Sequence, residues 1–347
     1  MLNGLDRFFR YISLKQLIIF NGLILVLILT MTVGISKGSF DFSVLKYFTG
    51  NLTTLEEEVL VNIRFPRVLL AAVVGAALSM SGACLQGLFR NPLADPGLIG
   101  VSAGAALGAA FSIVMSAEFF PDFLFTPYLL PLSAILGSAF VISILFIITR
   151  GFGFEGMTYM LLAGIAINAL AGVGIGILTY ISDDAELRGL TFWTMGSFGG
   201  VTWNLIIPAI VIILSTIIWT LRISRKLDLL QLGEPEAYRL GVDIKKLRFD
   251  IIMSSAIIVG ISVSLTGMIG FVGLVVPHLV RLFGGVNHHY LLACSALTGA
   301  ILMVNADLLS RILIQPAELP VGLITSAIGS PFFLWLIFRM RKKWALK

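Results

Sequence analysis

Three arginines and an aspartate lie in two separate segments of the chain, each at the outer end of an apolar run. Arg64 and Arg67 lie three residues apart, and Arg311 follows Asp307 by four residues. Side chains at such spacings share one face of a helix, and a guanidinium can bind a carboxylate through two parallel hydrogen bonds. The alternative is that these arginines only extend to lipid phosphates at a membrane surface. We expect Arg64, Arg67 and Arg311 to form an exposed basic set that binds carboxylates of a docking protein.

The other reactive side chains form no recognisable catalytic or metal motif. The histidines are His278, His288 and His289, and none belongs to an HExxH motif or a Cys/His cluster. Cys84 and Cys294 lie inside apolar runs, which predicts buried packing residues. The sequence has no Gly-Lys dipeptide and therefore no GxxxxGK phosphate loop. We expect no catalytic residue, metal site or bound cofactor here, so that ATP and Mg²⁺, if they drive the protein, bind to another chain.

Hydropathy predicts the elements that must position these residues. The 347 residues are 58% hydrophobic and only 12% charged, with a mean hydropathy of +0.99. A soluble chain of this length needs more polar surface, so this is an all-α integral membrane protein. A membrane helix needs about 20 apolar residues, and nine uncharged runs reach that length: 16–36, 68–89, 96–117, 123–149, 156–182, 189–221, 251–280, 282–306 and 319–338.

The distribution of basic residues predicts an even number of crossings. Both ends of the chain are basic, and the positive-inside rule places both termini in the cytoplasm. Gly267 and Gly270 can divide the run 251–280 into two short helices, about 250–266 and 268–285, which gives ten transmembrane helices. In this topology 18 of the 24 Lys and Arg residues lie inside, whereas the other six lie outside: Lys37, Lys46, Arg64, Arg67, Arg188 and Arg311.

One hydrophilic segment, 222–250, interrupts the apolar pattern in the cytoplasm. Gly233 and Gly241 flank a short helical piece, with Glu234 and Glu236 in its first turn, where the helix dipole favours acidic residues. Leucines alternate with charged residues along the segment. We expect an amphipathic helix that docks on a cytoplasmic partner; a solvated loop is the alternative.

Two further segments contain helix-breaking residues. Pro92 and Pro96 lie four apart between the second and third spans, which prevents a continuous helix there, and Asp95 can cap the helix after Pro96. A proton-relay role for Asp95 is the alternative. The stretch 267–284, GMIGFVGLVVPHLVRLFG, has four glycines and a proline in an apolar run. Such a helix suits the interior of a bundle beside a pathway, and this indicates a polytopic protein that moves a solute.

The sequence resembles the permease subunits of type II ABC importers for iron–siderophores, haem and cobalamin. The resemblance covers about 60–338 and rests on five blocks in register. They are RFPR at 64–67, GACLQGLFRNPLADPGLIGVSAGA at 82–105, FWTMGSFGG at 192–200, LGEPEAYRLG at 232–241, and the stretch 267–284 continued through Asp307 and Arg311 to ELPVGLITSAIGSPFF. One departure is Pro235, which still suits a first helical turn.

The resemblance implies a single permease domain, 1–347, in the bacterial cytoplasmic membrane. Its expected partners are a second permease subunit in a homodimer, two cytoplasmic ATPase subunits and an extracytoplasmic substrate-binding protein, with no nucleic acid. Arg64, Arg67 and Arg311 match positions that meet glutamates of the binding protein. The ATPase-coupling segment matches Leu232, Gly233, Glu234, Glu236, Ala237, Leu240 and Gly241. Pathway or gate candidates are Asn91, Pro92, Gly273, Pro277 and His278.

The segment 179–200 is most similar to the haem permeases of this family. We therefore expect haem as the substrate, which would pass without axial ligation by a histidine, because no histidine lies outside. A ferric siderophore is the close alternative and cobalamin a further one. Two other classes remain open from the residues: an ion-coupled secondary transporter, which would depend on Asp95 or Asp307, and an intramembrane enzyme, which would pair His278 with Asp307 across opposite faces.

Overall fold

The computed structural model describes residues 13–38, 53–119, 126–149 and 156–345, and the regular structure in these ranges is helical. Within these ranges, eight helical segments are long and apolar enough to cross a membrane, and two shorter apolar helices, α6 and α14, complete the predicted ten. These ten are α2 (Leu14–Ser36), α5 (Phe65–Phe89), α6 (Val101–Phe119), α7 (Thr126–Thr149), α8 (Gly156–Ile181), α10 (Trp203–Leu221), α13 (Ile244–Thr266), α14 (Val272–Gly284), α15 (His288–Ile312) and α16 (Val321–Ala345).

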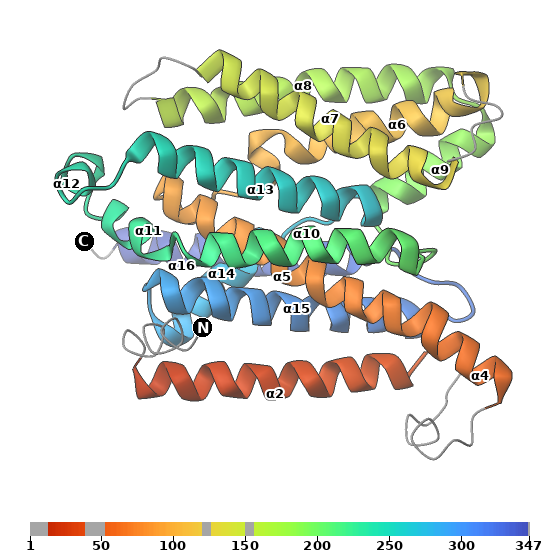
Figure 1. Cartoon of the computed structure of the whole chain (residues 1–347), viewed down its shortest axis with the longest axis horizontal. Helices are drawn as coiled ribbons and strands as arrows, with labels where there is room; N and C mark the ends of the chain where they lie inside the picture. Colours follow the sequence, from red (N-terminus) through yellow and green to blue (C-terminus); the bar gives the residue numbers. More distant parts are fainter. Residues whose placement is uncertain (1–12, 39–52, 120–125, 150–155, 346–347) are drawn as a thin grey trace.

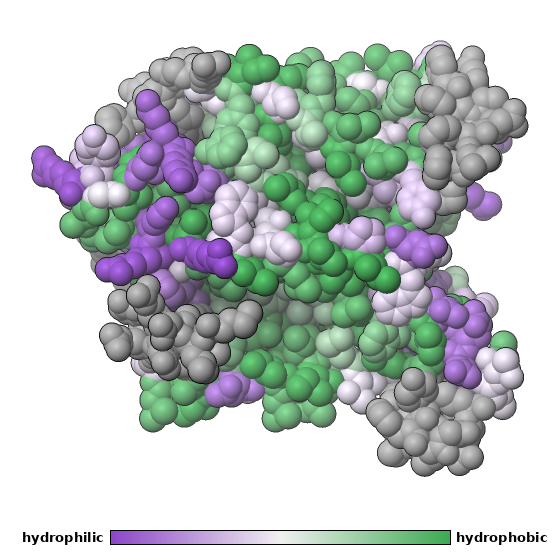
Figure 2. Space-filling view, in the orientation of Figure 1, coloured by the Kyte–Doolittle hydropathy of each residue, from purple (hydrophilic) through white to green (hydrophobic). Residues whose placement is uncertain are grey.

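The shorter elements lie at the two ends of the bundle. α11 (Ser224–Leu230) and α12 (Glu234–Arg239) project at the end where α2 begins and α16 ends (Figure 1). α4 (Thr54–Glu58) and α9 (Asp184–Met195) lie at the opposite end. Hydrophilic side chains gather at both ends around a hydrophobic middle (Figure 2). The charge distribution makes the α12 end cytoplasmic and the α9 end outer.

Helix α5 is the centre of the fold. It is buried along nearly its whole length and packs against α13, α14 and α15. Two glycines allow this close approach: a Cβ on Gly75 would collide with the backbone of Gly299 in α15, and one on Gly82 with the backbone of Gly273 in α14. Small residues at such contacts are the usual means by which membrane helices pack.

The predicted break in the run 251–280 is confirmed. Helix α13 ends at Thr266 and α14 begins at Val272, and between them Gly267 and Phe271 have left-handed backbone angles, with φ of 69° and 68°. A left-handed residue ends an α-helix, and glycine adopts this conformation without a Cβ penalty.

The prediction of one helix over 189–221 is wrong. This run contains most of α9 and all of α10, separated by a loop in which Gly196 and Gly200 both have positive φ. The loop is tied to its neighbours: the Ser197 N–H donates to the Thr266 carbonyl, and the Val321 N–H donates to the Gly196 carbonyl. Hydropathy does not distinguish one long helix from two helices joined by a loop, so it does not reveal that Gly196 and Gly200 interrupt this run.

Candidate functional site

Arg67, Arg311 and Asp307 form a buried ion-pair cluster at the outer end. Arg67, in the first turn of α5, donates from Nε to Asp307 Oδ1 at 2.7 Å. Arg311 donates from Nε to Asp307 Oδ2 at 3.1 Å. Asp307 is fully buried (0% exposed), and each of its two oxygens accepts from a different guanidinium. The i, i+4 spacing of Asp307 and Arg311 on α15 brings that pair together.

Two of the arginines also cap the end of α2. Arg64, in the π-helical segment η1 (Val59–Arg64), donates to the Ile35 and Ser36 carbonyls at 3.1 and 2.9 Å. Arg311 donates to the Gly34 and Lys37 carbonyls, both at 2.8 Å. The last carbonyls of a helix lack partners within the helix and carry its negative dipole end, which favours cations there. The outer end of α2 is therefore fixed to α5 and α15 by side chains.

The structure brings the three predicted arginines together, but the expectation that they are exposed is wrong. Arg64, Arg67 and Arg311 are only 5%, 6% and 5% exposed. A buried charge needs partners, and here they are Asp307 and the carbonyls at the end of α2. The sequence shows the spacing of the arginines, but it does not show that a third helix ends beside them.

The cluster reaches solvent through one further side chain, Glu318. Arg67 Nη1 donates to Glu318 Oε2 at 2.8 Å, and the Glu318 side chain is 46% exposed. Glu318 lies in the loop between α15 and α16. Leu313 and Ile314 of this loop, and Ile312 at the end of α15, are also exposed. The outer face thus combines a half-exposed ion pair with an apolar rim.

At the cytoplasmic end, α12 has the predicted glycine stops. Gly233 and Gly241 flank it with φ of 113° and 86°, and Glu234 and Glu236 lie in its first turn. One side of the α11–α12 segment is fixed to the bundle, because Leu227, Leu230 and Ala237 are fully buried. These features confirm the expected amphipathic helix.

The opposite side of this segment presents an apolar tip. Leu232, Tyr238 and Leu240 are 62%, 69% and 57% exposed. Glu234, by contrast, turns inward: both of its carboxylate oxygens accept from Arg248 Nη2, at 2.6 and 2.7 Å, and the residue is buried. Among the predicted coupling residues, Leu232 and Leu240 face outward, whereas Glu234 and Ala237 belong to the packing beneath them.

His288 ties the coupling segment to α15, a contact that the sequence analysis did not find. Its backbone N–H donates to Asp228 Oδ1 at 2.9 Å, and its Nδ1 lies 2.6 Å from the same oxygen. Asp228 belongs to α11, so this pair joins α11 to the first residue of α15. The neighbouring His289 lies 3.1 Å, through Nδ1, from Ser224 Oγ at the start of α11. Asp228 and His288 are 60 residues apart in the chain, and no short-range sequence pattern predicts their contact.

The pathway candidates divide between buried and exposed positions. Pro277 has no N–H, so the Gly273 carbonyl four residues earlier has no helical donor. Gln86 of α5 supplies one, from Nε2 to the Gly273 carbonyl at 3.1 Å, and its Oε1 accepts from Arg281. Pro277 predicts a free carbonyl in α14, but no sequence pattern identifies Gln86 of α5 as its donor.

The other three candidates do not join this group. Asn91 and Pro92 are exposed or partly exposed in the loop after α5, where Asn91 Oδ1 accepts from the Leu93 N–H. The His278 ring lies against the Phe332 ring of α16, with 6.0 Å between their centroids. Asp95 caps η2 (Pro96–Ile99) as predicted, by accepting from the Gly97 N–H at 2.8 Å. Burial raises the pKa of the Asp95 carboxyl, and this hydrogen bond opposes the rise.

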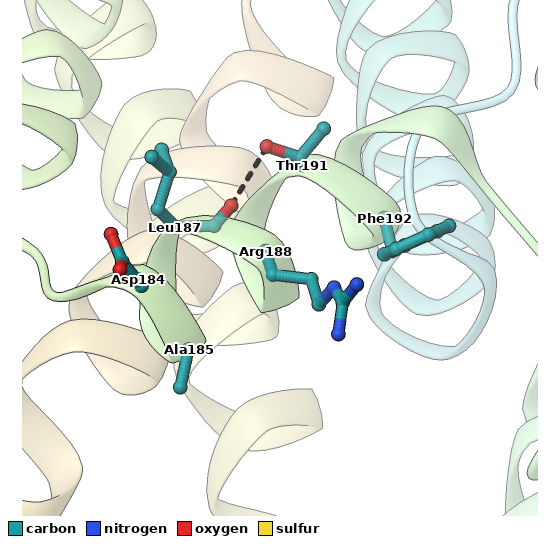
Figure 3. Close-up of a pocket in the computed structure, with 6 residues that line it drawn as sticks. All are labelled: Asp184, Ala185, Leu187, Arg188, Thr191 and Phe192. Atoms are coloured by element: carbon teal, nitrogen blue, oxygen red, sulfur yellow. Dashed lines mark hydrogen bonds between the residues drawn. The ribbon is translucent and has the colours of Figure 1, made fainter.

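An open pocket lies on the exposed face of α9 (Figure 3). Asp184, Ala185, Leu187, Arg188, Thr191 and Phe192 line it. The opposite side of the helix is packed, since Leu190 is buried against α6. The pocket offers a guanidinium that points toward an exposed aromatic ring, with a carboxylate and an aliphatic side chain farther along the helix (Figure 3). Among the described residues, no three His, Cys, Asp or Glu side chains are grouped as metal ligands.

The fold and these two ends define a polytopic permease subunit. The family model of the FecCD transport family matches residues 22–339. The chain is 46% identical over 323 residues to the hemin transport system permease protein of Yersinia pestis, covering 93% of this chain and 96% of that protein. It is 41% identical over 314 residues to a vitamin B12 import system permease protein of Vibrio parahaemolyticus, covering 90% and 92%.

A solved structure shows the same architecture. An inward-facing metal-chelate type ABC transporter superposes with a TM-score of 0.82 at 35% identity, covering 92% of this chain and 99% of that chain. The chain belongs to the FecCD transport family. It is an integral inner-membrane transport subunit of the ABC permease type.

Proposed function

We propose that this permease moves haem from an extracytoplasmic binding protein into the cytoplasm. The observation that carries the proposal is the 46% identity to a hemin permease over 93% of the chain, against 41% to a vitamin B12 permease. A ferric siderophore stays the close alternative. In this proposal haem crosses without axial ligation by a histidine of this chain.

We infer that α11 and α12 transmit ATP-driven motion from a partner ATPase. The exposed tip of Leu232, Tyr238 and Leu240 is the surface that would enter the ATPase, and apolar side chains at an exposed tip are typical of a protein contact. The Asp228–His288 pair would pass the motion to α15. Hydrolysis of ATP with Mg²⁺ would take place on two such ATPase subunits.

We propose that the binding protein docks through acidic side chains at the outer face of the arginine cluster. The half-exposed Arg67–Glu318 ion pair, which brings the buried Arg67 to the outer face, and the apolar rim at Ile312, Leu313 and Ile314 support this surface. Arg64 and Arg311 would contribute by fixing α2, α5 and α15 into one rigid surface. Neutralising acidic residues of the binding protein should then weaken binding, whereas binding that is insensitive to these changes would contradict the proposal.

A second copy of the chain is the proposed partner within the membrane. Helix α8 carries exposed apolar side chains, and a Cβ at Gly172 or Gly176 would meet open space. A neighbouring helix could therefore approach α8 closely. Cysteine at position 176 should form a crosslink between two subunits in membranes. Failure to crosslink at any position along this face of α8 would contradict the homodimer.

An ion-coupled carrier is less consistent with the geometry. Asp307 is held between two guanidiniums, and Asp95 caps η2, so both carboxylates have structural partners. A proton carrier needs a carboxylate that exchanges its proton with water along the pathway. Uptake that persists in an uncoupler but stops when ATP is depleted supports the ATP-driven function; the reverse pattern would contradict it.

A further inference from the structure

The two carboxylates on Arg67 differ in their surroundings. Asp307 is fully buried and also binds Arg311, so its departure would take the shared carboxylate away from two buried guanidiniums. Glu318 is half exposed, and its one hydrogen bond among the described residues is to Arg67. An ion pair at a half-exposed site contributes little net stability, because water solvates the separated charges well. Glu318 is therefore the exchangeable partner of Arg67.

The backbone around Glu318 allows this exchange without unfolding. Just after it, the Leu319 N–H donates to the Ser310 carbonyl at 3.0 Å, and the Val321 N–H donates to the Gly196 carbonyl at 2.9 Å. These bonds fix the start of α16 to the end of α15 and to the loop after α9. The Glu318 side chain can then turn into solvent while its neighbours stay in place.

We propose that Glu318 is a built-in competitor for the acidic side chain of the docking protein. When the outer face is empty, Glu318 occupies Arg67. An arriving carboxylate takes its place on Nη1, and Glu318 moves into water. Docking thus exchanges one ion pair for another and adds no net pair at this position. This inference rests on the proposed docking of an acidic binding protein at the outer face.

If Glu318 competes with the docking protein for Arg67, Glu318→Gln should change both the affinity and its dependence on salt. The variant keeps the shape of the side chain but removes the charge that must be displaced. Binding of the haem-loaded binding protein should become about two- to fivefold tighter, which corresponds to the strength of an exposed ion pair. The affinity should also fall more steeply with salt than in the wild type, because docking now creates a net ion pair that ions screen.

The test measures dissociation constants from 50 to 500 mM NaCl, with the permease–ATPase complex in nanodiscs and the binding protein on a biosensor. Glu57→Gln is the matched control, since it removes an exposed carboxylate from α4 at the same end. Tighter binding and a steeper salt slope in Glu318→Gln alone support the competitor. Equal changes in both variants mean that only the net charge of the outer face matters, and they overturn it.

Weaker binding in Glu318→Gln also overturns the proposal, because Glu318 would then contribute to docking. Thermal unfolding of the same samples checks that the variant folds as the wild type does. Failure of the docking proposal itself looks different. In that case the wild type keeps its affinity when the acidic residues of the binding protein are neutralised. If only the competitor proposal fails, the wild type still loses affinity and Glu318→Gln behaves as Glu57→Gln does.

Discussion

Replacing Asp307 with asparagine should destabilise the protein far more than replacing Glu318 with glutamine. Both changes remove one carboxylate from the same arginine at nearly constant side-chain volume. Asp307 is 0% exposed and binds Arg67 and Arg311, whereas the Glu318 side chain is 46% exposed and binds Arg67 alone. The comparison therefore isolates burial and the number of partners.

The magnitude follows from these contacts. An asparagine offers one acceptor oxygen, so one guanidinium loses its hydrogen bond to residue 307. The two buried arginines also lose the carboxylate that they share, which leaves Glu318 as the one remaining carboxylate paired with them. Removing one partner from a buried pair costs about 3–5 kcal/mol. The half-exposed Glu318 pair contributes about 0–1 kcal/mol. At about 2 °C per kcal/mol for a large chain, we expect Asp307→Asn to lower the melting temperature by on the order of 6 °C.

The assay is thermal unfolding of both purified variants in one detergent, followed by circular dichroism and by tryptophan fluorescence. Glu318→Gln should stay within about 2 °C of the wild type. If Asp307→Asn melts no earlier than Glu318→Gln, the cluster does not hold the outer ends of the helices together, and our reading of the buried arginines is wrong.

Three further predictions concern the interior and the cytoplasmic end. Gln86→Leu should lower the free energy of unfolding by about 2 kcal/mol, because the Gly273 carbonyl and Arg281 lose their hydrogen-bond partner. Thermal unfolding measures this loss, and a variant as stable as the wild type would refute the structural role of Gln86. Leu240→Glu should keep the free energy of unfolding within about 0.5 kcal/mol of the wild-type value but should reduce co-purification of the ATPase. Lys246→Glu, elsewhere on the cytoplasmic end, should leave co-purification unchanged. His288→Ala should lower transport per ATP hydrolysed in proteoliposomes, because α11 loses the side-chain half of its contact with α15 and keeps only the backbone bond to Asp228 and the Ser224–His289 contact. An unchanged ratio would exclude a role of the His288 side chain in this link.

Much of the architecture follows from composition and glycine positions. The ten apolar helices, the break at Gly267 and the stops at Gly233 and Gly241 are predictable, because hydropathy and left-handed backbone angles are local properties. The cap by Asp95 follows from its place before Pro96 for the same reason. The division between α9 and α10 was missed because an uncharged run has the same hydropathy with or without a loop.

The sequence predicts which residues form the candidate sites better than it predicts their burial and their partners. Arg64, Arg67 and Arg311 can be selected from the sequence, but their burial depends on where α2 ends, which is a tertiary property. The Asp228–His288 pair joins residues 60 positions apart. The inward turn of Glu234 depends on Arg248 in the next helix. Each of these features needs the packed structure.

The most direct test of the proposed function is ATPase stimulation of the reconstituted complex by its binding protein. The protein is loaded in turn with haem, a ferric siderophore and cobalamin, and uptake of each into proteoliposomes is measured in parallel. We predict that the haem-loaded protein stimulates hydrolysis and that haem accumulates inside. Accumulation of the siderophore or cobalamin without haem would contradict the haem assignment, and haem uptake without ATP would contradict the ATP-driven mechanism.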